Sequence, residues 1–121
     1  MCGLAVRAQV IRDTSYGNGA DTFVGNDSNK GYQTNFGDND SMDIRYLPDA
    51  RAHLGYVRID ISEVTNMTGA QLQFDINSSN TSGTFVWSIY GLTDEADDDW
   101  DEMAITYDNS PWMEPTTPVE N

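Results

Sequence analysis

The sequence has few of the residues that build most catalytic and covalently cross-linked sites. Its 121 residues include one cysteine, Cys2, and one histidine, His53. A disulfide within this chain and a zinc cluster are therefore excluded, and a serine-histidine-aspartate site has little support. The chain also lacks the GxSxG, HExxH and glycine-rich phosphate-binding motifs. These absences disfavour an enzyme.

Basic residues and long apolar runs are also scarce. Six Lys and Arg stand against 20 Asp and Glu, for a net charge of -14. Such a surface repels nucleic-acid phosphates and anionic membranes. No apolar run reaches the roughly 18 residues that a membrane helix needs. We therefore expect neither a nucleic-acid partner nor membrane insertion. Mobile cations, calcium among them, are the natural partners of this field, and the alternative is that the charge only keeps the surface soluble.

The composition of the chain divides it into three parts. Residues 1–19 read as an N-terminal tail or the remnant of a signal peptide, because Val6-Arg7-Ala8 has the small residues of a cleavage site. We interpret residues 20–112 as one incomplete domain. Residues 113–121 are rich in Pro and Thr, and we interpret them as a linker or as the start of a missing part.

The domain shows the alternation of β-strands and almost no helical periodicity. Segments rich in Gly, Asn, Asp and Ser separate the apolar stretches, which favours antiparallel strands joined by turns. Clustered acids within 92–103 leave room for at most one helical turn. The expected fold is an all-β antiparallel sandwich of jelly-roll type. About eight strands are usual for such a fold, so the domain is expected to be truncated at its C-terminus. The predicted strands are 21–24, 41–46, 53–61, 70–76, 84–92 and 105–107.

The period of two also predicts which side chains face the core. The alternation places one face of each of two strands inward, and it turns Tyr56 and Arg58 outward. The expected core residues are Val57, Ile59 and Ile61 from one strand and Leu72, Phe74 and Ile76 from the other.

Tyr56 and Arg58 are the first candidates for a ligand site. A planar guanidinium beside a phenol suits an acidic sugar, because arginine binds carboxylates through two hydrogen bonds. The alternative for Arg58 is an ion pair with Asp43 or Asp75. Arg45 and His53 complete the set of candidate ligand-binding residues.

Two further hypotheses concern the aromatic and acidic side chains. We expect Trp100 to be structural and to anchor the acidic loop onto the sandwich, the alternative being a platform for sugar. Calcium accepts six to eight oxygen ligands in irregular geometry, so acidic loops can bind it without a motif. Turn formation by Asn and Asp is the alternative. The candidate calcium ligands are Asp21, Asp27 and Asp97.

Six short motifs, in order, resemble the DNRLRE-domain family, which is also classed as carbohydrate-binding module family 96. The resemblance covers about residues 20–112, and no single motif is specific. The matching positions are Ala20-Asp21-Thr22, Asn35 with Gly37, Arg58 with Asp60 and Ser62, Tyr90-Gly91, Trp100 with Glu102, and Ile105-Thr106 with Asn109 and Pro111.

The resemblance implies a non-catalytic polysaccharide-binding module of a secreted or cell-surface bacterial protein. Such modules are tethered to other domains, and the members studied for binding recognise acidic polysaccharides such as alginate. The alternative is a structural or adhesive spacer domain with no ligand of its own. A binding module predicts exposed Tyr or Trp and one or two Arg on one sheet face or loop rim, whereas a spacer predicts buried aromatics and a featureless acidic exterior.

Overall fold

The computed structural model describes residues 9–26, 32–46, 52–77, 86–92 and 94–111. The chain divides into two compact units. The first unit contains the residues up to Val64 together with Trp100–Ser110, and the second contains Thr65–Asp99 and the residues from Pro111. The strands belong to the first unit, and a single turn of 3-10 helix, η1 (Glu95–Asp97), belongs to the second.

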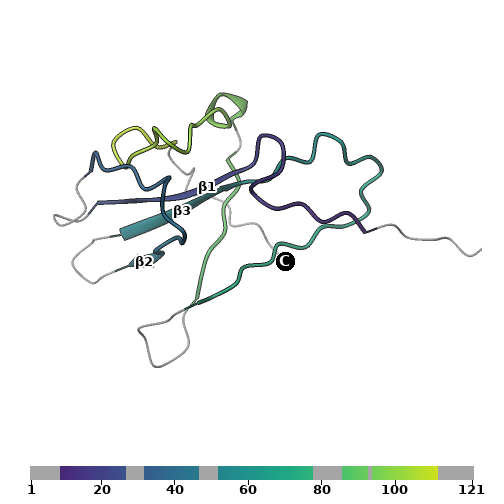
Figure 1. Ribbon diagram of the computed structural model, residues 1–121, viewed down its shortest axis with the longest axis horizontal. Helices are drawn as coiled ribbons and strands as arrows, with labels where there is room; N and C mark the ends of the chain where they lie inside the picture. Colours follow the sequence, from purple (N-terminus) through teal and green to yellow (C-terminus); the bar gives the residue numbers. More distant parts are fainter. Residues whose placement is uncertain (1–8, 27–31, 47–51, 78–85, 93, 112–121) are drawn as a thin grey trace, which may run out of the picture. The chain divides into compact units, whose positions relative to one another are not determined.

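An antiparallel sheet of three strands forms the centre of the first unit (Figure 1). Its order is β1 (Ala20–Gly25), β3 (Ala52–Arg58) and β2 (Arg45–Tyr46). The register runs from Ala20 opposite Arg58 to Gly25 opposite His53. Residues directly opposite each other in such a pair point to the same face, so this register decides which side chains share a surface.

A tight turn leads into β1. Asp13 accepts hydrogen bonds from the Ser15 backbone N at 3.1 Å and from its hydroxyl at 2.7 Å. Gly17 has a φ of 59°, and a Cβ there would overlap the Asp60 carboxylate. This left-handed, closely packed position requires glycine. The Asp, Ser, Gly and Asn residues within 13–19 are of the types that form turns, and the structure places a turn there.

One face of the sheet carries the main apolar cluster. Val24, Tyr56 and Ile105 are buried there. Because Ile105 lies outside the sheet, the segment that contains it covers this face. Three partly buried residues pack against the cluster, namely Leu54, Trp100 and Tyr107.

The opposite face is covered by a different segment. The Phe23 ring stacks on Phe36, with centroids 4.3 Å apart and planes at 14°, and it lies 5.5 Å from the His53 ring. Ile44 lies over Gly55, where a Cβ would be 2.8 Å from the Ile44 Cδ1 atom. Both faces of the β1–β3 pair are thus covered, which explains why five of the six β1 residues are buried without alternation.

The predicted inward faces are wrong. Ile61 is 51% exposed, Leu72 48% and Ile76 56%. The β3 strand ends at Arg58, before Ile61, and Tyr56 points inward because residues 100–107 cover its face. Residues 70–76 form no strand. Phe74 instead contacts Trp87 edge to face within the second unit, with centroids 6.1 Å apart.

The remaining strand predictions have mixed outcomes. The strand at 21–24 is confirmed by β1, those at 41–46 and 53–61 are shorter than predicted, and η1 confirms a single helical turn at most. In the predicted strand 84–92, residues 84–85 lie outside the described residues and 86–92 form no strand, and residues 105–107 form none either. In the latter, the Ile105 N donates to the Asp101 O at 2.8 Å and the Thr106 N to the Asn109 side chain at 2.6 Å, so local turns take the place of a ladder. The all-β antiparallel class is confirmed, and the jelly-roll sandwich stays a prediction.

We expect Trp100→Ala to destabilise the first unit. The indole contacts Tyr56 edge to face at 5.9 Å, and the Arg58 guanidinium lies 5.0 Å above its ring. Removing a ring that is only half-buried should cost about 2–3 kcal/mol of unfolding free energy, less than a fully buried one. Urea unfolding measures the loss, with Trp100→Phe as a milder control. An equally stable Trp100→Ala variant that loses glycan affinity would instead identify the ring as a sugar platform.

Acid unfolding should depend on Asp60. Hydrogen bonds from Ser62, and from the Asn18 backbone N at 2.9 Å, lower the pKa of Asp60 to about 2. An unfolded aspartate has a pKa of about 3.9. The stabilisation is therefore fully present above about pH 4 and is lost as the pH falls towards 2. Melting temperatures should fall more steeply over this range in the native chain than in Asp60→Asn. Parallel curves for the two proteins would contradict this role.

Candidate functional site

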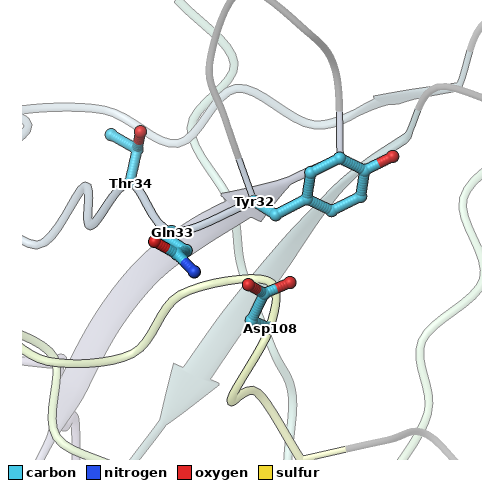
Figure 2. Close-up of a pocket in the computed structure, with 4 residues that line it drawn as sticks. All are labelled: Tyr32, Gln33, Thr34 and Asp108. Atoms are coloured by element: carbon cyan, nitrogen blue, oxygen red, sulfur yellow. The ribbon is translucent and has the colours of Figure 1, made fainter.

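Two loop segments of the first unit form an open groove with a volume of about 400 Å³. Tyr32, Gln33 and Thr34 line it from one segment and Asp108 from the other. Figure 2 shows the Gln33 amide and the Asp108 carboxylate facing each other beside the Tyr32 ring. Tyr32 is 51% exposed. The groove falls within the usual volume range of small-ligand sites, roughly 300–1,000 Å³.

The two segments are joined directly at the groove. The Asp108 backbone N donates to the Tyr32 carbonyl at 3.1 Å. The Tyr32 ring meets Tyr107 edge to face, with centroids 5.6 Å apart and planes at 70°. Such aromatic pairs contribute about 0.5–1.5 kcal/mol beyond their buried area. The exposed ring is therefore held at a defined angle.

The Asn35 side chain, next in the chain to the groove residue Thr34, connects the same two segments. Its amide N donates to the Glu102 carbonyl at 2.8 Å and to the Ile105 carbonyl at 2.7 Å. Its amide oxygen accepts from the Gly37 N at 3.1 Å. A Cβ at Gly37 would overlap the Glu102 carbonyl, so glycine permits this close approach. We call this arrangement the Asn35 clamp.

Asn109 fixes the turn that carries Asp108. Its side-chain oxygen accepts from the Thr106 N at 2.6 Å and from the Thr106 hydroxyl at 3.1 Å. Its amide N donates to the Ala104 carbonyl at 3.1 Å. These hydrogen bonds hold the turn that contains Asp108. The backbone position from which its carboxylate extends to the rim of the groove is therefore fixed.

The groove combines an exposed aromatic ring with side chains that form hydrogen bonds. An exposed phenol ring offers an apolar face to the C–H groups of a sugar, using the amphipathic character that places tyrosine at interfaces. The Gln33 amide can donate and accept hydrogen bonds, and an ionised Asp108 only accepts them. A hydroxyl-rich ligand could therefore stack on Tyr32 while its hydroxyls bond to the polar rim.

Two of the predicted ligand residues, Arg45 and His53, form a polar cluster with Asp43, in which the His53 ring is buried and the other two side chains are exposed. His53 is 1% exposed. Its Nδ1 lies 3.1 Å from the Asp43 carboxylate, and its Nε2 lies 3.2 Å from the Arg45 guanidinium. Arginine stays protonated and can only donate, so Nε2 accepts, and a neutral ring carries its proton on Nδ1. This cluster links β2 and β3.

The other two, Tyr56 and Arg58, lie on the opposite face of the sheet. Tyr56 is buried, and Arg58 donates to the Asn18 carbonyl at 2.6 Å and the Trp100 carbonyl at 2.9 Å. The register places Arg58 opposite Ala20, on the Tyr56 face, and His53 opposite Gly25. The structure thus does not bring the four residues together in one site, and ligand contact at any of them stays a prediction.

Two of the three candidate calcium ligands lie among the described residues. Asp21 accepts a hydrogen bond from the Thr14 hydroxyl, and Asp97 is the last residue of η1 in the second unit. Asp27 lies outside the described residues. Within the part of the chain that the structure describes, no three His, Cys, Asp or Glu residues are placed to hold a metal ion. Calcium binding stays a prediction.

Comparison with models of known protein families shows which family this chain belongs to. The model of carbohydrate-binding module family 96 matches residues 12–119. The chain belongs to carbohydrate-binding module family 96. A search of curated proteins and a search of solved structures gave no significant match. Among the described residues, no helix has the length and apolarity to cross a membrane.

Several motifs that resemble family 96 act as structural joints in this chain. Asn35 and Gly37 form the clamp, Arg58 holds Trp100, and Asn109 closes a turn. Sequence reasoning missed Tyr32, Gln33, Thr34 and Asp108. Their position next to family motifs could have indicated them. Residues 32–34 immediately precede the motif residue Asn35, and Asp108 immediately precedes the motif residue Asn109.

We expect Asn35→Ala to disrupt the groove of this family 96 module as well as its stability. Two backbone carbonyls lose their amide donor, and unsatisfied polar groups cost about 1–3 kcal/mol. Urea unfolding should show this loss of stability. Asn39→Ala, which removes an exposed asparagine of the same segment, is the matched control. Equal stability of the two variants would show that the clamp has no structural role.

Proposed function

We propose that this family 96 module binds polysaccharide in the Tyr32 groove and performs no catalysis. The observation that carries the proposal is the half-exposed Tyr32 ring, held by Tyr107 beside the Gln33 and Asp108 side chains. Family membership supports carbohydrate as the class of ligand. The spacer alternative predicts no such combination of an exposed ring with polar neighbours.

The groups that line the groove favour binding over hydrolysis. Glycosidases position two carboxyl groups across the scissile bond, about 5–10 Å apart. Asp108 is the one carboxylate among the described residues that line the groove. One acid without a carboxylate partner can orient a sugar hydroxyl, but it does not supply the pair that retaining or inverting hydrolysis uses.

The setting of the module is part of the proposal. Carbohydrate-binding modules usually act outside the cell, where they hold an attached domain near its polysaccharide. We infer an extracellular or cell-surface location and attachment to other domains of a larger protein. The acidic composition, with a net charge of -14, suits a solvated extracellular surface.

Tyr32→Ala should abolish most of the binding. Affinity electrophoresis through gels that contain soluble glucan, mannan or polyuronate measures retardation of the native chain. Loss of the stacking ring should weaken binding by about tenfold or more, equivalent to about 1.4 kcal/mol, whereas Tyr32→Phe should keep most of it.

The matched control is Trp87→Ala, which removes an aromatic side chain of the second unit that does not line the groove. It should bind as the native chain does. If the native chain is not retarded by any of the polysaccharides, the module is a spacer. If Trp87→Ala loses binding and Tyr32→Ala does not, the site lies elsewhere.

A further inference from the structure

We propose that Asn18 is a deamidation site that the turn before β1 keeps closed in the folded protein and that becomes reactive when this turn loses its hydrogen bonds to Asp60 and β3. The sequence contains one Asn-Gly pair, Asn18-Gly19. Asn18 is exposed, so water has access to its side chain. The inference concerns the chemistry of this turn and does not depend on glycan binding.

Deamidation joins the backbone to the asparagine side chain. The Gly19 backbone N attacks the side-chain carbonyl carbon of Asn18, a new C–N bond forms, and the side-chain nitrogen leaves as ammonia with the proton that the Gly19 N gives up. Water then opens the five-membered succinimide ring at one of its two carbonyls, which yields aspartate or isoaspartate. Glycine in the second position favours the attack because it has no Cβ that would hinder it.

Three hydrogen bonds hold the backbone of the Asn-Gly pair in the folded turn. The Asn18 N donates to the Asp60 carboxylate at 2.9 Å, and the Arg58 Nε donates to the Asn18 carbonyl at 2.6 Å. The attacking nitrogen is itself engaged, because the Gly19 N donates to the Tyr16 carbonyl at 2.9 Å. Bringing this nitrogen onto the side-chain carbon would break its hydrogen bond.

The space around the pair is limited as well. A Cβ at Gly19 would overlap the Thr14 carbonyl, and one at Gly17 would overlap the Asp60 carboxylate. The succinimide ring must therefore form in an opened turn. Under that condition the observed rate equals the rate in the open chain multiplied by the fraction of molecules in which the turn is open.

Asp60 is the acceptor that most of these contacts share. Its carboxylate accepts from the Asn18 N and from the Ser62 N, both at 2.9 Å, and it lies against Gly17. Hydrogen bonds to an ionised acceptor are stronger than neutral ones. Asp60 follows the end of β3 at Arg58, so it ties the turn to the segment after the sheet. Loss of this carboxylate should raise the open fraction of the turn.

Deamidation would also weaken the first unit. Both products place a new negative charge near Asp60, and isoaspartate adds one backbone atom shortly before β1. Arg58 donates to the Asn18 carbonyl and to the Trp100 carbonyl. A displaced residue 18 removes one of these two acceptors, so the modified chain should unfold at a lower denaturant concentration.

The test follows the mass of the tryptic peptide 13–30 during incubation at mildly alkaline pH, with fragment ions that assign the modified residue. The native chain is incubated folded and in guanidinium chloride, beside folded Asp60→Ala, Asp60→Asn and Asn18→Gln. Asp94→Ala is the matched control. Asp94 also accepts a hydrogen bond from the backbone N two residues later, that of Ala96, but it belongs to the second unit.

We expect Asn18 to react at least about tenfold more slowly in the folded native chain than in guanidinium chloride. Asp60→Ala should react at least about threefold faster than the folded native chain, with Asp60→Asn in between. Asp94→Ala should match the native rate, and Asn18→Gln should show no mass gain at this position. Circular dichroism checks folding, and Asp60→Asn carries the comparison if Asp60→Ala does not fold.

Three results would overturn the inference. Equal rates in the folded and the denatured native chain would show that the turn gives no protection. An unchanged rate in the folded Asp60 variants, or an equal increase in Asp94→Ala, would show that Asp60 does not keep the turn closed. Absence of modification in guanidinium chloride would show that Asn18 is not a deamidation site.

Discussion

The Asn35 clamp is the interaction on which the rest of the first unit depends. Residues 102–105 form no strand, so their carbonyls have no ladder partners, yet buried carbonyls need donors. The Asn35 amide bonds to the carbonyls of Glu102 and Ile105. Once these are satisfied, Ile105 can enter the core with Val24 and Tyr56. A single polar side chain thus allows an irregular segment to cover one face of the sheet.

The clamp also joins the coverings of the two faces. Phe36, next to Asn35 in the chain, stacks on Phe23 on one side of the sheet, while Ile105 packs on the other. A sheet of three strands has little apolar area of its own, and small domains bury a limited part of their surface. Covering both faces with loop segments lets a short, polar and acidic sequence bury β1 almost completely.

Sequence alone could predict the features that depend on residues close together in the chain. The turn before β1, β1 itself, the single helical turn and the packing role of Trp100 follow from local chemistry or short motifs. The inward face of β3 could not be predicted, because a period of two defines two faces without saying what covers each. Alternation at residues 70–76 likewise specifies no pairing partner. The groove depends on Tyr32 meeting Asp108, a contact between distant segments.

At the groove, family motifs and groove-lining residues are neighbours in the chain. Asn35 and Asn109 use their side chains to hold backbone groups, which leaves the preceding residues, Tyr32–Thr34 and Asp108, to face solvent. Residues that fix a loop and residues that line the groove are neighbours in the chain, but their physical tasks differ. A substitution at a joint alters the position of the whole loop, whereas a substitution at the rim alters only charge or hydrogen bonding.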